Sequence, residues 1–116
     1  MKTPGKATLL RIFVGDSDRW HGEPLAEAIV RRARELQLAG ATLLRGHMGY
    51  GANSRLHTAR ILRLSEDLPV VVEIVDTREN LDRLLPELDR MVTEGLITLE
   101  EVEVIRYRAD AEQGHP

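Results

Sequence analysis

Apolar residues along this chain recur first with the period of a strand, then with the period of a helix, and the alternation repeats. Residues 7–14 are apolar on both faces, which is typical of a central strand. From residue 23 an apolar stripe predicts a helix with Pro24 in its first turn and Gly40 at its end. A second strand is predicted over residues 41–48.

The second half of the chain repeats this order. Residues 68–75 are rich in β-branched side chains and predict the clearest strand. Asp76 and Glu79 have the spacing of a cap pair for a second helix, which Pro86 should kink and Gly95 should end.

A capping-box sequence at residues 98–101 predicts one helical turn before a last strand over residues 102–107. Residues 7–108 should form the ordered core of a single domain spanning residues 1–116, with residues 109–116 as a tail. The order β-α-β-β-α-β predicts the α+β class: a ferredoxin-like sandwich with a four-stranded antiparallel sheet and a long loop after the second strand.

In this topology both helices lie on one face of the sheet. The residues expected to line the other face are apolar: Leu9, Phe13, Val71, Val75 and Ile105. Because monomers rarely expose such a face, a partner subunit should cover it.

Composition narrows the classes of function. Apolar residues make up 42% of the 116 residues and aromatic ones only 3%, so the core must be aliphatic. A net charge of −3 argues against a general binder of nucleic acid, and the lack of cysteine excludes thiol chemistry. No signal peptide or membrane span is evident, which predicts a cytoplasmic protein without membrane insertion. Residues 16–21 predict a turn with Trp20 capping the core.

Closely spaced glycines follow the second strand. Gly46, Gly49 and Gly51 either let a ligand approach the backbone or form a bulge or kink. The connection over residues 46–67 exceeds the about 12–15 residues of ordinary long loops. It is either a functional loop or an elongated hairpin that packs on a neighbouring subunit.

The segments GATLLRGHMGYG, LSEDLPV, LLP and GLIT, in this order, resemble the PII-like family catalogued as domain of unknown function 190. The resemblance implies a ferredoxin-like homotrimer with its sheets facing inward, related to the PII nitrogen-signalling proteins and the CutA-like proteins. In PII proteins, adenine nucleotides bind in clefts between subunits, and the T-loop after the second strand changes shape in response.

The resemblance also implies a ligand site. Gly40-Ala41-Thr42 matches the PII Gly-x-Thr pattern and residues 49–51 match Gly-aromatic-Gly, which implies Thr42 near the base and the glycine backbone near sugar or phosphate. The predicted binding residues are Thr42, Gly46, Gly49, Tyr50, Gly51, Arg106 and Arg108. The two arginines either meet an anion across a subunit interface or pair with Glu101 and Glu103.

AMP, ADP and ATP are the candidate ligands. Ala52-Asn53 replaces the Arg-Gln of PII proteins, and residues 93–98 lack the lysine of their phosphate loop. These departures favour a nucleotide with fewer phosphates, or another small anion, over a triphosphate.

The predicted function is signalling rather than catalysis, because no nucleophile-elbow or Walker motif is present. Arg55, Arg60 and Arg63 should present the loop to a protein partner, either a transporter or an enzyme. One alternative is a CutA-like protein that binds divalent metal, although His47 and His57 match no compact ligand pattern and no metal site is assigned. The other alternative is a trimeric scaffold without a ligand.

Overall fold

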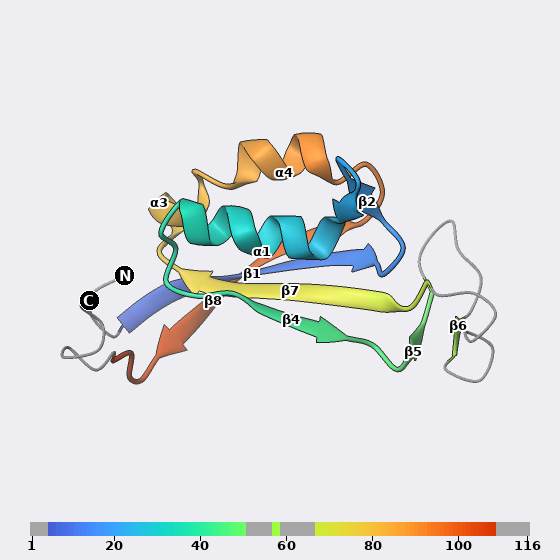
Figure 1. Cartoon of the computed structure of the whole chain (residues 1–116). Coiled ribbons are helices and arrows are strands. Elements are labelled where there is room, and N and C mark those ends of the chain that lie inside the picture. Colours follow the sequence, from blue (N-terminus) through green and yellow to red (C-terminus); the bar gives the residue numbers. More distant parts are fainter. Residues whose placement is uncertain (1–4, 51–56, 59–66, 109–116) are drawn as a thin grey trace.

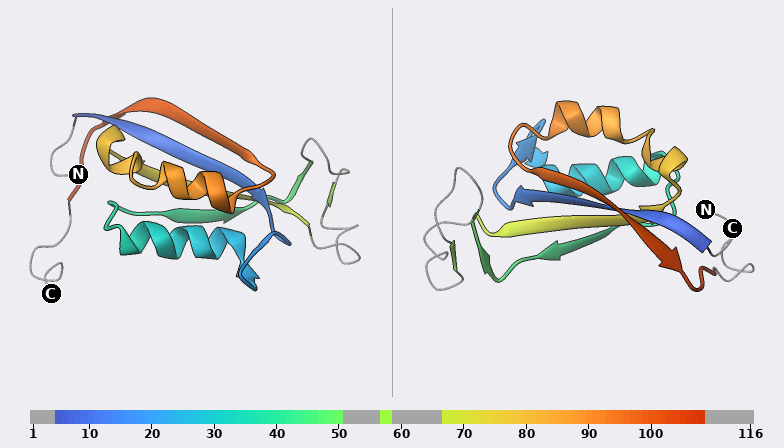
Figure 2. Two further views of the ribbon diagram at one scale, coloured as in Figure 1. Left: turned by 90° about the horizontal axis from the view of Figure 1, so that it is seen from above. Right: turned by 180° about the vertical axis from the view of Figure 1, so that it is seen from behind.

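The computed structural model describes residues 5–50, 57–58 and 67–108. A twisted four-stranded sheet forms one layer, and helices form a second layer over one of its faces (Figure 1). Views from above and from behind show the helices on that same side, and none of the described helices lies over the opposite face (Figure 2). The two-layer arrangement agrees with the prediction.

The sheet consists of β1 (Gly5–Gly15), β4 (Thr42–Arg45), β7 (Pro69–Asp76) and β8 (Leu96–Val104), in the order β4-β7-β1-β8. Each neighbouring pair is antiparallel. α1 connects β1 to β4, and the segment with α3 and α4 connects β7 to β8. This is the ferredoxin-like topology, so the predicted fold class is confirmed.

Two short hairpins accompany the sheet. β2 (Arg19–Trp20) and β3 (Glu23–Pro24) are joined by His21 and Gly22, whose positive φ angles of 51° and 85° suit a tight type I′ turn. Trp20 packs half-buried against the core, as predicted. β5 (Met48–Gly49) pairs with β6 (His57–Thr58), so this part of the long connection extends a hairpin.

The first helix ends earlier than predicted. α1 (Leu25–Glu35) begins directly after Pro24, which is its N-cap rather than a residue of its first turn, and its C-cap is Leu36 rather than a residue next to Gly40. Gln37 takes a left-handed φ of 63°, which ends the helix and leaves Gly40 in the connection to β4.

The prediction of one kinked second helix was wrong. α3 (Arg78–Leu81) and α4 (Leu85–Met91) are separate, and Pro86 lies in the first turn of α4. Proline lacks an N–H and its ring clashes with the carbonyl four residues earlier, so it starts a helix more readily than it interrupts one. The N-cap of α3 is Thr77, whose hydroxyl accepts a hydrogen bond from the Asn80 N–H at 3.1 Å, rather than Asp76.

The last strand also differs from its prediction. Residues 98–101 form no helical turn but lie within β8, paired with residues 8–11 of β1. The strand therefore runs over Leu96–Val104 and ends before Tyr107. A continuous ladder with the longest strand satisfies more backbone groups than a single capped turn would.

The core lies between the helices and the sheet and is aliphatic, as the composition predicted. Its largest fully buried apolar side chains come from both layers: Leu10, Ile12, Val70, Val72 and Ile74 from the sheet, and Ile29, Leu81, Leu84 and Leu88 from the helical layer.

The opposite face of the sheet is organised in rows that follow the strand register. One row is apolar and consists of Leu44, Val71, Phe13 and Leu96. The next row is polar and consists of Thr42, Glu73, Arg11 and Thr98. Arg11 pairs with Glu73 at 2.9 Å and with Glu100 at 3.5 Å, so this arginine has a carboxylate partner on each neighbouring strand. Ile105, expected to line this face, follows the end of β8 and is 80% exposed.

Asp76, at the end of β7, is the buried charged residue of the described core. Its carboxylate accepts hydrogen bonds from the Ala39 N–H at 2.7 Å, the Thr77 N–H at 2.6 Å and the Asn80 side-chain amide at 2.9 Å. Burial alone would raise the pKa of Asp76, but these hydrogen bonds to the charged form outweigh it and lower the pKa. Asp76 thereby joins the connection before β4 to the start of α3.

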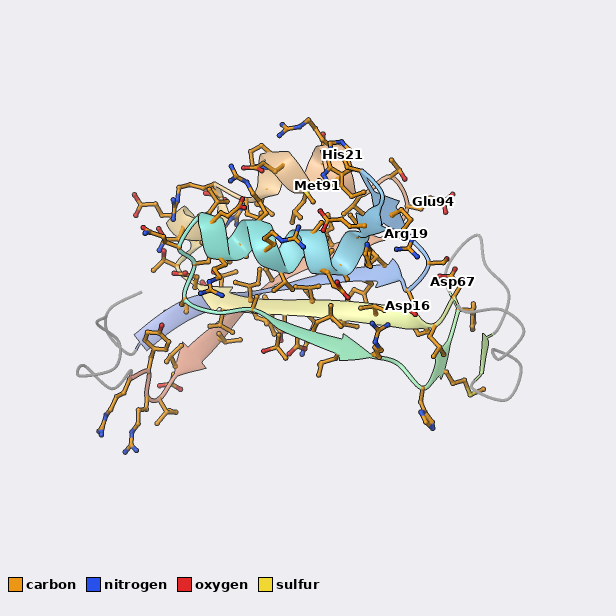
Figure 3. The ribbon with its side chains drawn as sticks, in the orientation of Figure 1. Asp16, Arg19, His21, Asp67, Met91 and Glu94 are labelled. Atoms are coloured by element: carbon orange, nitrogen blue, oxygen red, sulfur yellow. The ribbon has the colours of Figure 1, made fainter. Side chains whose placement is uncertain are left out.

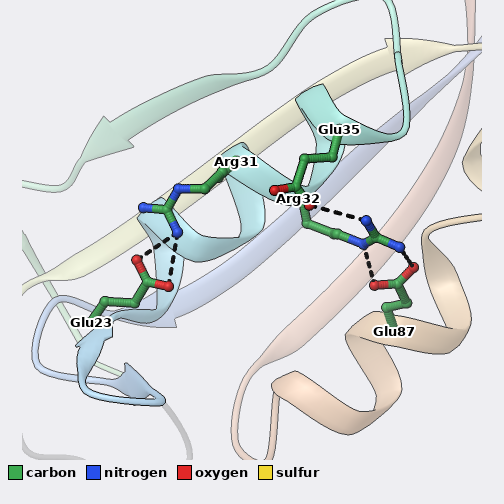
Figure 4. Close-up of polar contacts among 5 residues, drawn as sticks. All are labelled: Glu23, Arg31, Arg32, Glu35 and Glu87. Carbon is green, nitrogen blue, oxygen red and sulfur yellow. Dashed lines mark hydrogen bonds and ion pairs between the residues drawn. The ribbon is translucent and has the colours of Figure 1, made fainter.

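An ion-pair cluster joins the two long helices (Figure 4). Arg32 of α1 binds both carboxylate oxygens of Glu87 in α4, at 2.5 and 2.9 Å, and also Glu35 at 3.0 Å. Beside it, Arg31 pairs with Glu23 at 2.6 Å. The hydrogen bonds from Arg32 lower the pKa of Glu87 below its usual range, and the two glutamates raise the pKa of Arg32.

Replacing the buried carboxylate should weaken the fold. In Asp76→Asn, the new amide places an N–H donor where Asp76 accepts from backbone donors, so we expect a loss of about 1–3 kcal/mol in the free energy of unfolding. The pKa of Asp76 is lowered in the folded state, so its contribution to stability is fully present above the pKa of the unfolded chain, about 3.9. This contribution is lost as the pH falls below that value and through the folded-state pKa. Urea denaturation at several pH values measures both effects. The exposed Asp82→Asn is the control, and equal losses in the two variants would contradict this role.

The pair between Arg32 and Glu87 should give a pH-dependent contribution. At pH 7 we expect Glu87→Gln to lower the melting temperature by about 2–5 °C, since a half-exposed pair contributes little more than a surface one. The lowered pKa of Glu87 means that this difference disappears as the pH falls below about 4.3. Thermal melts of the wild type, Glu87→Gln and the exposed control Glu101→Gln test this. A difference that persists at pH 3 would exclude the ion pair as its cause.

Candidate functional site

At the base of the long loop, Gly46 and Gly49 lie against the ring of Pro69, the first residue of β7. The Gly46 N–H donates to the Pro69 carbonyl at 2.7 Å. A Cβ atom on Gly46 would lie 2.6 Å from Pro69 Cγ, and one on Gly49 would lie 2.8 Å from the same atom. Neither glycine has a positive φ. Their small size therefore makes room for the proline ring, and no left-handed turn is involved.

The turn after β1 contacts both arms of this base. Arg45, the last residue of β4, forms an ion pair with Asp16. On the other arm, Asp67 accepts hydrogen bonds from the Ser17 N–H at 3.2 Å and the Ser17 hydroxyl at 2.8 Å. Figure 3 shows Asp16 and Asp67 at the end of the sheet where β7 begins. We refer to Asp16, Ser17, Arg45 and Asp67 as the base clamp.

Local backbone geometry makes the clamp possible. A Cβ on Gly15 would lie 2.2 Å from Asp67 Oδ1, so glycine leaves the space that this carboxylate occupies. The Gly15 N–H donates to the Asp18 carboxylate at 2.9 Å, and the Asp16 N–H donates to the Leu68 carbonyl at 2.8 Å. The turn is thus held independently of the side-chain pair between Asp16 and Arg45.

The two predicted arginines lie toward the other end of the sheet. Arg106 and Arg108 follow β8, and the Tyr107 hydroxyl between them donates to the Ala39 carbonyl at 3.1 Å. This contact places the segment beside the connection that leads into β4. Thr42, the first residue of β4, is exposed opposite Glu73.

The structure thus divides the predicted site in two. Gly46 and Gly49 adjoin Pro69, at the start of β7, whereas Arg106 and Arg108 lie near its end at Asp76. The length of β7 separates the two groups, about 20 Å for a strand of this length. A single small anion cannot contact both groups of one chain.

Several predicted residues belong to the part of the loop that the structure does not describe. Gly51, Arg55, Arg60 and Arg63 lie outside the described ranges. Tyr50, at the last described position before the gap, is 74% exposed.

The alternative pairing of Arg106 and Arg108 with Glu101 and Glu103 is not observed. Within residues 5–50 and 67–108, neither arginine forms an ion pair. Their guanidinium groups are exposed.

A shallow groove of about 230 Å³ lies between α1 and α4. Ala28 and Met91 are the buried residues among its lining, and Trp20 is half-buried beside them. The charged residues of its walls include the Arg31–Glu23 and Arg32–Glu87 pairs described above. These two arginines already have carboxylate partners, whereas Arg90, also in the lining, forms no ion pair among the described residues.

Two further features are absent from the described part of the chain. It contains no group of three histidine, aspartate or glutamate side chains placed to hold a metal ion. None of its helices is long and apolar enough to cross a membrane.

Sequence reasoning missed the base clamp. Asp16 and Ser17 looked like ordinary turn residues, and Asp67 was only the end of a connection. The spacing between residues 16 and 67 carries no local signal, since their contact depends on how β1, β4 and β7 lie beside one another. The one hint in the sequence was that Gly15 directly follows one predicted strand and Asp67 directly precedes another. Antiparallel pairing brings these two positions to the same end of the sheet.

Comparison with known proteins places this geometry in context. The model of the family DUF190, described as uncharacterized ACR, matches residues 7–104. A UPF0166 protein of Aquifex aeolicus is 42% identical over 100 residues, which cover 86% of this chain and 94% of the relative.

Solved structures share the fold at low identity. The nitrogen regulatory PII-like protein CPII of Thiomonas intermedia, bound to ADP, AMP and bicarbonate, has a TM-score of 0.67 at 14% identity, covering 87% of this chain and 90% of CPII. CutA of Synechococcus elongatus has a TM-score of 0.53 at 14% identity, covering 87% and 79%. The match over residues 7–104 and the identity to the Aquifex relative show that the chain belongs to the DUF190 family.

Proposed function

We propose that the protein is a homotrimeric PII-like regulatory protein that binds a small anionic ligand, an adenine nucleotide, in clefts between subunits. The observation that carries this proposal is the sheet face without helices. Its apolar row crosses all four strands, and its charged row is internally paired. A face of this kind suits burial against other copies, because burying paired charges costs less than burying single ones.

The division of the predicted site supports an intersubunit ligand. If one ligand contacts both the loop base and Arg106 or Arg108, these groups must come from different chains. The solved CPII structure holds ADP, AMP and bicarbonate, all anionic. By analogy, AMP, ADP and ATP are the ligands proposed here, with those of fewer phosphates favoured.

The proposed output is a protein contact rather than a reaction. Residues 46–67 would relay ligand binding to a transporter or an enzyme through Arg55, Arg60 and Arg63, within a single cytoplasmic domain of residues 1–116. Divalent-metal binding is the alternative, since a second CutA neighbour is described as a divalent cation tolerance protein. Metal titration followed by thermal melts separates the two, since a ligand that binds only the folded state raises the melting temperature.

Assembly is the first test. Light scattering coupled to size exclusion should give about three times the 13.1 kDa mass of one chain. Phe13→Lys places a charge in the apolar row and should give monomers, whereas Phe13→Leu keeps the surface apolar and should remain trimeric. A monomeric wild type, or a trimeric Phe13→Lys with unchanged thermal stability, would rule out this face as the interface.

Ligand binding is the second test. Calorimetry with AMP, ADP and ATP should detect binding to the wild type and a loss of about tenfold or more in affinity for Arg106→Gln/Arg108→Gln, since contacts to charged groups contribute most. Arg34→Gln, exposed on α1, is the matched control.

Mixed oligomers then test where the site is built. Chains carrying Arg106→Gln/Arg108→Gln can be co-expressed with chains carrying Tyr50→Ala. If the site joins two subunits, the mixed oligomers recover some intact sites and some binding. If well-mixed oligomers recover no ligand binding, the whole site lies within one chain. If the wild type itself binds none of the nucleotides, the alternative of a trimeric scaffold without a ligand is favoured.

A further inference from the structure

Arg45 adjoins the glycines of the loop base in the sequence. It directly precedes Gly46, and its backbone pairs with Val70, whose side chain is buried on the helical side of the sheet. The Arg45 side chain is 51% exposed, and its partner Asp16 is 31% exposed. β4 is an edge strand within the chain, so this guanidinium is open to solvent.

Three other paired arginines of the described chain have more carboxylate contacts than Arg45, whereas Arg78 resembles Arg45 in having one exposed partner, Asp82. Arg11 lies between two carboxylates, Arg31 contacts both oxygens of Glu23, and Arg32 contacts Glu87 and Glu35. Arg45 has a single carboxylate partner in the described structure. An exposed pair of this type contributes little to stability, so another anion can replace the partner at low cost.

Asp16 offers Arg45 the same chemistry that an anionic ligand offers. A guanidinium pairs with two oxygens of a carboxylate, a phosphate or a bicarbonate in closely similar geometry. The turn that carries Asp16 is held by other contacts: the Asp16 N–H to the Leu68 carbonyl, and Ser17 to Asp67. Asp16 can therefore release Arg45 while its backbone stays in place.

We propose that Arg45 binds the oxyanion of the ligand, and that the Asp16 carboxylate occupies its guanidinium as an internal competitor in the free protein. This inference rests on the proposed function, since it assigns a further residue to the same site. It makes a signed prediction: removing the competitor strengthens binding, although it deletes an observed ion pair. A merely structural role for the pair would weaken binding or leave it unchanged.

The test is calorimetry on the full chain with ADP, AMP and bicarbonate as separate ligands, which distinguishes a nucleotide phosphate from a free anion. Asp16→Asn should raise affinity by about two- to fivefold, the range of an exposed ion pair. Arg45→Gln should lower it by about ten- to a hundredfold, and Arg45→Lys should recover part of the loss. Circular dichroism melts establish that each variant folds.

Two matched controls complete the design. Arg19→Gln removes another exposed arginine at the same end of the molecule, and Asp82→Asn deletes an exposed ion pair outside the base clamp, the one with Arg78. Neither should change affinity more than twofold. If the wild type binds and both Asp16→Asn and Arg45→Gln bind with the same affinity as it does, this inference alone is overturned. The same holds if Asp16→Asn binds more weakly than the wild type. Absence of binding to the wild type overturns the proposed function together with it.

Discussion

The helices of this protein cover one face of the sheet, and the rest of the structure depends on that imbalance. On the covered face, aliphatic side chains from both layers form the fully buried core. On the other face the strands carry an apolar row beside a row of paired charges. A sheet that is apolar on both faces favours burial of both, and the described residues of this chain cover one.

Carboxylates hold both ends of β7, the strand that lies between β1 and β4. At its start, Asp67 accepts hydrogen bonds from Ser17 in the turn after β1. At its end, Asp76 accepts a hydrogen bond from the Ala39 N–H in the connection before β4. The Ala39 carbonyl in turn accepts a hydrogen bond from the Tyr107 hydroxyl. The two ends differ in exposure, since Asp76 is fully buried and Asp67 is half-buried. The buried end suits a structural anchor, whereas the half-exposed end is within reach of a ligand.

The topology was predictable because it follows from the order of periodic segments, and β1 and β7 lie within one or two residues of their predictions. Local signals failed where tertiary contacts compete with them. Residues 98–101 have a capping-box sequence but form a strand, because they pair with β1. Gln37 takes a left-handed conformation and ends α1 before Gly40. The candidate site was harder still, because the separation of Arg106 from Gly46 and the contact of Ser17 with Asp67 depend on the packing of distant segments. Sequence spacing contains neither.

The packing of Pro69 against two glycines has a consequence for how the family can vary. Since a side chain at position 46 or 49 would occupy the space of the proline ring, these three positions are coupled through volume. A relative that loses the proline at the start of this strand is freed to replace either glycine, while one that keeps the proline must keep both. An alignment of relatives should therefore show these glycines covarying with the proline, whether or not the ligand is the same, and their retention alone is poor evidence of a shared ligand.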